Sequence, residues 1–260
     1  KGVKLKTPIF KTNVLLYLLL ALVLLSSQSM TDEIKFNIGK DAYPPYIIIK
    51  DEKISSGIIF DITNKIAKTH GHTVAFFRVE RKKVNFSLKE VETDATARIK
   101  IWQPQDANYI STDSIILIKN VLFFVSENDF KFETLVDLYG KKLKTHIGYS
   151  YPDLEELMKK GFIRRYDEYT EIEMLEKLLN SDGKFDATIL DERVGLWLMN
   201  NMEVEKKFSI AKKSLGKYEY KIMFHNKWKK FVLDFNKELL KMKENGDLDK
   251  IINNYMDSAN

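Results

Sequence analysis

The chain has 260 residues, with 42 Lys and Arg against 37 Asp and Glu, and no cysteine. Without cysteine, a disulfide scaffold, a thiol nucleophile, a cysteine-ligated zinc site and an iron–sulfur cluster are excluded. A hydrophobic share of 44% is that of a globular protein and not of a disordered one.

The net charge of +5 comes mostly from the first residues of the chain. Residues 1–29 hold four lysines and no acid, so taking those four from the 42 basic residues leaves 38 against 37 acidic ones. A nucleic-acid partner requires a basic face that neutralises phosphates. The charge balance therefore gives no indication of one.

Residues 1–29 have the pattern of a secretory signal peptide. A basic stretch is followed by twelve apolar residues at 14–25 and by small polar residues at 26–29. The alternative is a transmembrane anchor, but twelve residues fall short of the roughly 20 that a spanning helix needs. Ser27 and Ser29 suit cleavage before Met30, and no cysteine is present for a lipoprotein anchor. We therefore expect a cleaved signal peptide and an exported chain.

From residue 34 onward, short apolar runs alternate with segments of helical period. The predicted strands are 34–38, 74–79, 95–101, 115–125, 143–147, 187–190 and 218–224. The predicted helices are 61–70, 154–160, 172–182 and 228–245, each ended by a nearby glycine. This alternation predicts an α/β protein with parallel sheets. The strand at 115–125 has no turn signal inside it, which suits a segment that runs between two lobes.

Enzyme motifs are missing from the sequence. It has no glycine-rich phosphate loop, no G-x-S-x-G and no H-E-x-x-H. We therefore expect no catalysis, no cofactor and no metal site.

Polar and aromatic residues follow three of the predicted strands. They are DAYPPY at 41–46, GYSY at 148–151 and Asp191. Ligands of open α/β sheets bind beyond the carboxyl ends of strands, so these segments are candidates for one cleft. Each also has a structural alternative: an ordinary turn, a loop that caps a helix, and the N-cap of the helix after residue 191.

In this order the segments resemble the extracellular solute-binding proteins of family 3, periplasmic receptors for polar amino acids. The resemblance covers residues 34–256 and rests on five segments: DAYPPY (41–46), GIIFDITNKIAKTHGHTV (57–74), DLYGKKLKTHIGYSY (137–151), FDATILDERVGLWLM (185–199) and FNKELLKMKENGDLDKIINNYM (235–256). It implies the type II periplasmic-binding-protein clamp, an α/β fold of two lobes. Lobe 1 would be 30–117 plus 217–260 and lobe 2 would be 118–216, with hinge strands near 116–125 and 218–224.

The resemblance also implies ligand-binding residues. Asp41, Tyr43 and Tyr46 match the first pocket loop, where an aromatic ring covers the ligand, and Trp102 follows the strand at 95–101. In lobe 2, Asp191 matches the acid that holds a ligand ammonium. The loop there is matched by Tyr149, Ser150 and Tyr151, at a helix start that would offer backbone N–H groups to an anion.

One departure from the family concerns the usual Thr-Pro-x-Arg segment, whose Arg clamps the ligand carboxylate. The matching stretch here is Gln103-Pro104-Gln105-Asp106, so an acid stands in place of the Arg. Arg98 in the preceding strand is either a replacement for that Arg or a surface residue at a lobe edge.

The function implied is that of a monomeric periplasmic receptor that delivers a small polar, amino-acid-like solute to the permease of an inner-membrane ABC transporter. Two alternatives remain open. One is an exported dehydratase-like enzyme on the same clamp, and the other is a sensory or interaction module that has lost ligand binding.

Overall fold

The computed structural model describes residues 2, 32–39, 42–51, 53–79, 92–100 and 108–257. The chain divides into two units, Lys1–Asp32 and Glu33–Asn260, and the account below concerns the second. The predicted signal peptide, Asp41, Trp102 and the stretch 103–106 lie outside the described residues.

Within the described residues, one sheet of ten strands forms the centre of the second unit, in the order β4-β1-β5-β12-β7-β10-β8-β9, with β6 on β12 and β11 on β7. These strands are β1 (Glu33–Ile38), β4 (Thr73–Arg78), β5 (Ala95–Ile99), β6 (Tyr109–Ser111), β7 (Ile116–Val125), β8 (Lys142–His146), β9 (Arg164–Glu168), β10 (Ala187–Asp191), β11 (Phe208–Ile210) and β12 (Gly216–His225). A separate hairpin pairs β2 (Ile48–Lys50) with β3 (Lys53–Ser56).

The sheet is mixed, so the expectation of parallel sheets was only partly right. β1 is parallel to β4 and β5, and β8 is parallel to β9 and β10. The two long strands β7 and β12, however, run antiparallel to each other and to their outer neighbours. A strand that crosses from one half of the sheet to the other runs opposite to the strands beside it. The alternation of predicted strands and helices in the sequence does not reveal this change of direction.

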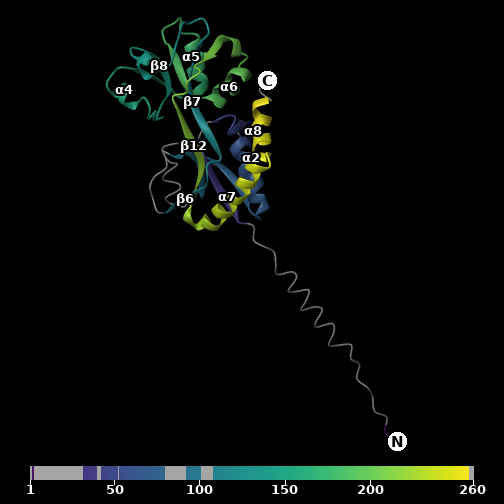
Figure 1. Ribbon diagram of the computed structural model, residues 1–260. Coiled ribbons are helices and arrows are strands. Elements are labelled where there is room, and N and C mark those ends of the chain that lie inside the picture. Colours follow the sequence, from purple (N-terminus) through teal and green to yellow (C-terminus); the bar gives the residue numbers. More distant parts are fainter. Residues whose placement is uncertain are drawn as a thin grey trace. The chain divides into compact units, whose positions relative to one another are not determined.

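The helices pack against the sheet (Figure 1). They are α2 (Ile58–Thr69), α4 (Glu155–Lys159), α5 (Glu171–Leu179), α6 (Glu192–Asn201), α7 (Lys229–Glu244) and α8 (Asp247–Asp257), with short 3₁₀ turns at Leu135–Leu138, Glu205–Lys207 and Asn226–Trp228. The apolar stripe of α7 is buried through Phe231, Phe235 and Leu239, as its period predicts. α5 begins with a capping box in which Thr170 and Glu173 bond each other's backbone N–H.

β7 and β12 join the two halves of the sheet. They pair over Ile116–Asn120 and Gly216–Tyr220, and each then continues into a different half. Figure 1 shows them running from the region of α7 and β6 to that of β8, α5 and α6. The predicted lobe boundaries, 117/118 and 216/217, fall on these two strands. The largest buried cluster includes residues from both predicted lobes, so the division into lobes stays a prediction.

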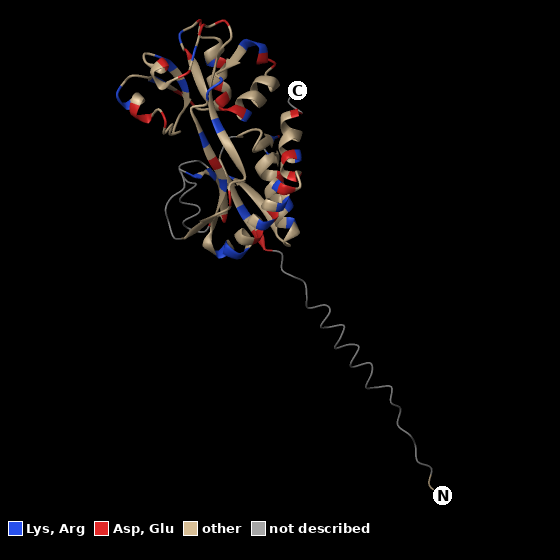
Figure 2. Cartoon of the chain, viewed as in Figure 1, with Lys and Arg blue, Asp and Glu red and all other residues tan. Residues whose placement is uncertain are grey.

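Charged residues of both signs are interspersed over the helices and the ends of the sheet (Figure 2). Among the described residues, no helix combines the length and the apolar character needed to span a membrane.

Candidate functional site

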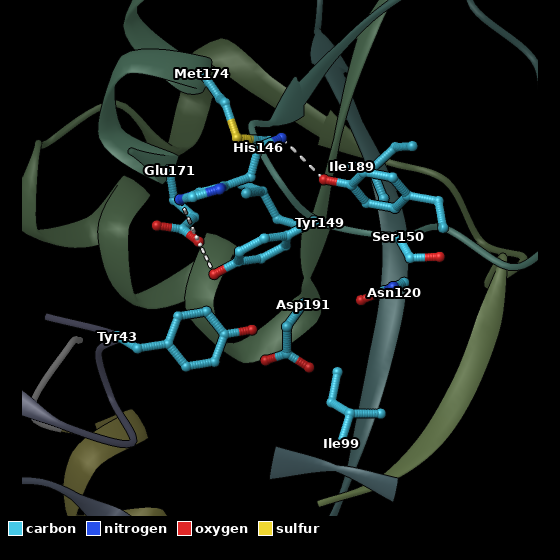
Figure 3. A pocket seen from close by; sticks show the side chains of 12 residues that line it. Tyr43, Ile99, Asn120, His146, Tyr149, Ser150, Glu171, Met174, Ile189 and Asp191 are labelled. Atoms are coloured by element: carbon cyan, nitrogen blue, oxygen red, sulfur yellow. Dashed lines mark hydrogen bonds and ion pairs between the residues drawn. The ribbon is translucent and has the colours of Figure 1, made fainter. Parts of the chain in front are cut away.

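A small cavity of about 20 Å³ lies beyond the carboxyl ends of β8 and β10. β8 and β10 are parallel, so their ends meet at one edge of the sheet, the position where ligands of such sheets bind. The lining residues come from five helices and strands and two loops, and Figure 3 shows their side chains. They are Tyr43, Ile99, Asn120, His146, Tyr149, Ser150, Tyr151, Glu171, Met174, Ile189, Leu190 and Asp191.

Five of the residues predicted to bind ligand meet at this cavity: Tyr43, Tyr149, Ser150, Tyr151 and Asp191. Tyr46 lies behind the wall, fully buried, and its hydroxyl donates a hydrogen bond of 2.8 Å to Asp191 Oδ1. That these residues bind a ligand stays a prediction, because their meeting at a cavity shows only that they share a site.

The loop at 43–47 is held against the start of α2. The N–H groups of Ile58 and Ile59 donate to the carbonyls of Pro45 and Tyr46, at 2.9 and 3.0 Å, so the turn satisfies two of the free donors at the helix start. Gly57 makes this approach possible, because a Cβ at its position would lie 2.3 Å from the carbonyl oxygen of Tyr46 and its φ is +131°. The contact brings the ring of Tyr43 to the cavity.

Asp191 is the N-cap of α6, which confirms the structural alternative for this residue. Its Oδ1 accepts the N–H groups of Arg193 (3.1 Å) and Val194 (3.2 Å), and its Oδ2 accepts the N–H of Lys119 on β7 (3.0 Å). Burial raises the pKa of the Asp191 carboxyl, against the opposing effect of the hydrogen bonds from Tyr46 and Lys119. The same side chain thus caps a helix and forms one wall of the cavity.

The loop at 148–151 does not open a helix, so the prediction of a helix start at Ser150–Tyr151 was wrong. α4 begins only at Glu155 and has five residues. Two residues explain why the helix begins after Tyr151 and not at Ser150. Gly148 has a left-handed φ of +77°, and Tyr151 precedes Pro152, which disfavours helical backbone in the residue before it. The expected N–H donors for an anion are therefore not arranged as a helix start.

Arg165 of β9 holds this loop in place instead. Its Nη1 donates to the carbonyl of Tyr149 and its Nη2 to that of His146, both at 2.9 Å, while its Nε bonds Asp167 at 2.6 Å. The guanidinium also lies over the ring of Tyr151, 5.3 Å from its centroid. A planar fork of donors suits two neighbouring carbonyls, and it fixes the backbone that carries Tyr149 and Tyr151.

The most polar part of the cavity is formed by His146, Tyr149 and Glu171, of which only Tyr149 is predicted from the sequence. The Tyr149 hydroxyl donates to Glu171 Oε1 at 3.0 Å, and its ring stacks on His146 with centroids 3.9 Å apart. Glu171 follows β9, whose sequence RRYDE is too charged to be predicted as a strand. Because the sequence does not predict this strand, no predicted strand end points to Glu171 in the way that the end of the strand at 187–190 points to Asp191. His146 is the last residue of β8, and it stands one residue before the end of the predicted strand 143–147.

The phenols around the cavity keep their protons at neutral pH. Burial, with the Asp191 charge as the next cause, raises the pKa of both Tyr43 and Tyr46. Burial likewise raises the pKa of Tyr151, whose hydroxyl accepts the N–H of His146 at 2.9 Å. These tyrosines can therefore donate hydrogen bonds and present neutral rings.

Arg98 is not among the residues that line the cavity, whereas its neighbour Ile99 is. Successive side chains of a strand point to opposite faces, which places Arg98 on the other face of β5. Arg98 stands opposite Lys221 of β12 in the register. This placement argues against Arg98 as the partner of a ligand carboxylate, and the variant Arg98→Ala is the test.

In the part of the chain that the structure describes, no group of three or more His, Asp or Glu side chains is arranged to hold a metal ion.

Residues 36–258 match the sequence profile of the bacterial extracellular solute-binding proteins, family 3. Sequence comparison with curated proteins gave no match. Many solved structures are similar. One is an arginine third transport system periplasmic binding protein from Legionella pneumophila, at 18% identity and a TM-score of 0.67, covering 86% of this chain and 100% of that one.

Two other similar structures have different roles in their names. A histidine kinase sensor domain with similarity to periplasmic binding proteins matches at 19% identity and a TM-score of 0.71, over 87% of this chain and 96% of that one. The ancestral amino-acid-binding protein AncCDT-1, a precursor of cyclohexadienyl dehydratase, matches at 14% identity and a TM-score of 0.67, over 86% of this chain and 95% of that one.

A mixed sheet whose halves are joined by two long strands, with a cavity at the junction, defines the type II periplasmic-binding-protein fold. The chain belongs to the bacterial extracellular solute-binding proteins of family 3, whose profile covers nearly the whole second unit.

Proposed function

We propose that this chain is a periplasmic receptor for a small, amino-acid-like solute with a cationic group, and that it passes the solute to the permease of an inner-membrane ABC transporter. The observation that carries the proposal is the charge of the cavity. Two buried carboxylates, Asp191 and Glu171, line it, and among the described lining residues there is no Lys or Arg. A buried carboxylate requires donors or a cation, since an unpaired buried charge costs several kcal/mol.

The aromatic residues support the same ligand class. The rings of Tyr43, Tyr149 and Tyr151 line the cavity, and the face of an aromatic ring attracts a cation. The name of the Legionella pneumophila neighbour, an arginine transport protein, agrees with a cationic amino acid. The proposal includes export by removal of residues 1–29, and binding without turnover.

The size of the cavity favours the sensory or interaction module as a second candidate. About 20 Å³ holds roughly one water molecule, so an amino acid enters only if the walls move apart. The Tyr46 hydroxyl also donates a hydrogen bond to the Asp191 carboxylate, where a ligand ammonium was expected. A histidine kinase sensor domain shares the fold. A chain of this second kind would bind no small solute.

A thermal-shift screen separates the two candidates. The panel would hold L-arginine, L-lysine and agmatine as cations, L-glutamine as a neutral amino acid, and L-glutamate and succinate as acids. A ligand at a hundred times its Kd stabilises the folded state by about 2.7 kcal/mol, which is roughly 5–10 °C in Tm for a domain of this size. We expect the cations to give the shift. A shift with the acids alone would contradict the proposal, and no shift with any solute would favour the second candidate.

Turnover is tested separately, because the dehydratase precursor shares the fold. Incubation of the chain with arogenate or prephenate should leave both unchanged, as measured by chromatography. Formation of product would show an enzyme.

A further inference from the structure

We infer that Glu171 is the residue that binds the cationic group of the ligand, and that Asp191 is committed to holding the fold together. The inference rests on the proposed function and assigns the ligand's ammonium or guanidinium group to one of the two acids. Both acids are nearly excluded from solvent, with 3% of Asp191 and 9% of Glu171 exposed. They differ in how many donors already surround them.

Asp191 already accepts four hydrogen bonds. Its Oδ1 accepts from the Tyr46 hydroxyl and from the N–H groups of Arg193 and Val194, and its Oδ2 accepts from the N–H of Lys119, which leaves one lone-pair site on Oδ2. Three of these donors are backbone amides, fixed by α6 and β7. A ligand cation at Asp191 would therefore find one lone-pair site on Oδ2, beside a carboxylate charge that four donors already compensate.

Glu171 has far fewer donors. The Tyr149 hydroxyl is its one hydrogen-bond donor among the described residues, at 3.0 Å, and no Lys or Arg of that part of the chain forms an ion pair with it. Glu171 stands in the first turn of α5, whose helix dipole favours an anion by only about 0.3–1 kcal/mol. That contribution is well below the cost of a buried charge without a partner.

The imidazole of His146 does not supply the missing charge when it is neutral. Its Nε2 lies 3.9 Å from Glu171 Oε1, beyond hydrogen-bond distance. Its Nδ1 lies 2.8 Å from the carbonyl oxygen of Ile147. A carbonyl only accepts, so Nδ1 carries the proton, and the neutral ring has no proton on Nε2 to offer Glu171.

The surroundings of Glu171 suit an organic cation. Figure 3 shows the Tyr149 hydroxyl pointing to the Glu171 carboxylate, with His146 beside them and the phenol of Tyr43 on the side of Asp191. The rings and the single open carboxylate together form a site for an ammonium or guanidinium group. The ligand class is therefore an organic cation whose charge lies at Glu171.

The test is isothermal titration calorimetry of the full chain with L-arginine, agmatine and L-citrulline, the last being the analogue of arginine whose side chain is a neutral ureido group and whose α-ammonium is kept. Glu171→Gln keeps an acceptor for Tyr149 and removes only the charge. We expect this variant to bind arginine and agmatine at least about 30-fold more weakly than the wild type does. Its affinities for arginine and citrulline should then be close to each other. A residue that merely supports the fold would not change that ratio.

The matched control is Glu176→Gln, the same change of charge on the exposed face of the same helix. It should bind arginine like the wild type. Glu171→Asp, which keeps the charge on a shorter side chain, should retain part of the preference for arginine over citrulline. If circular dichroism shows that Glu171→Gln is unfolded, Glu171→Asp takes its place in the test.

Three results are decisive. Wild-type affinity for arginine in a folded Glu171→Gln chain overturns the inference and leaves the proposed function standing. A larger loss of arginine affinity in an Asp191→Asn chain that circular dichroism shows to be folded than in Glu171→Gln also overturns it, because the cation would then lie at Asp191. A wild-type chain that binds none of the three solutes overturns the proposed function, and the inference with it.

Discussion

Asp191 illustrates at the residue scale how one side chain can meet two requirements. It ends β10, caps α6 and faces the cavity, and the hydroxyl of Tyr46 from the loop after β1 completes its set of donors. The residue type that a helix start needs is the type that a ligand ammonium also needs, so sequence alone could not decide between them.

Replacement of Asp191 by Ala should lower the stability of the fold. The lost cap costs about 1 kcal/mol, and the buried Tyr46 hydroxyl left without a partner adds about 1–3 kcal/mol. Urea unfolding at pH 7 should therefore show a loss of about 2–4 kcal/mol. Glu192→Ala, a partly exposed neighbour whose ion pair with Lys119 is on the surface, is the control and should cost less than about 1 kcal/mol. A loss below 1 kcal/mol in Asp191→Ala would contradict the role in the fold.

Arg98→Ala tests whether this arginine replaces the one that the family usually carries. Because Ile99 and not Arg98 lines the cavity, we expect the Kd for L-arginine to change by no more than about two-fold. Loss of arginine binding with agmatine binding intact would show that Arg98 holds the ligand carboxylate. Titration of the variant with both solutes distinguishes the cases.

At the scale of elements, an ion cluster joins β8, β9 and α5 behind the cavity. Lys144 and Glu168 are nearly fully buried and pair at 2.5 Å, and the more exposed Lys177 bonds the other oxygen of Glu168. Lys144 also lies 3.8 Å from the centroid of the Phe185 ring. The cluster fixes α5, and with it Glu171, against the two strands.

Glu168→Gln should destabilise the chain by about 3–5 kcal/mol, because it leaves the Lys144 charge buried without a partner. Lys177→Ala removes the exposed member and should cost less than about 1 kcal/mol. Urea unfolding of both variants at pH 7 makes the comparison. Equal losses would contradict the distinction between the buried and the exposed lysine.

The same cluster predicts a pH dependence. Burial alone would raise the pKa of Glu168, but the hydrogen bonds from Lys144 and Lys177 outweigh it and hold the pKa below its ordinary value. A lowered pKa means that the folded state binds fewer protons than the unfolded one. The stabilisation from Glu168 is therefore complete above the ordinary value of about 4.3 and disappears as the pH falls through the lowered one. The stability difference between wild type and Glu168→Gln, measured by urea unfolding, should shrink below pH 4.3.

At the scale of the whole second unit, β7 and β12 are the strands that pass from one half of the sheet to the other. The cavity between the halves holds about one water molecule. A solute of amino-acid size therefore requires the halves to separate and then to close around it, and strands that hinge are a common way to do so.

Small-angle scattering should show that the unliganded chain has a larger radius of gyration than this structure, because its halves part to admit a solute. Saturating L-arginine should reduce that radius, while the far-UV circular dichroism stays the same. L-glutamate, which we do not expect to bind, is the control. A clear thermal shift with an unchanged radius of gyration would contradict hinge closure.

The sequence determined much of the fold. Apolar period and glycine stops located seven strands and four helices to within a few residues, because burial of one face is a local, periodic requirement. The short or charged strands β2, β3, β6, β9 and β11 were missed, since an edge strand such as β9 can be mostly charged. The order of the pocket segments was sufficient to indicate the family.

The tertiary structure decided which polar residues face the cavity and which are already satisfied. Asp191 was visible in the sequence as a polar residue after a strand, but its four donors come from β7, α6 and a tyrosine 145 residues away. Glu171 reaches the same cavity only because β9 lies beside β8. Whether a carboxylate has room for a ligand depends on contacts between distant segments, and no local pattern in the sequence records them.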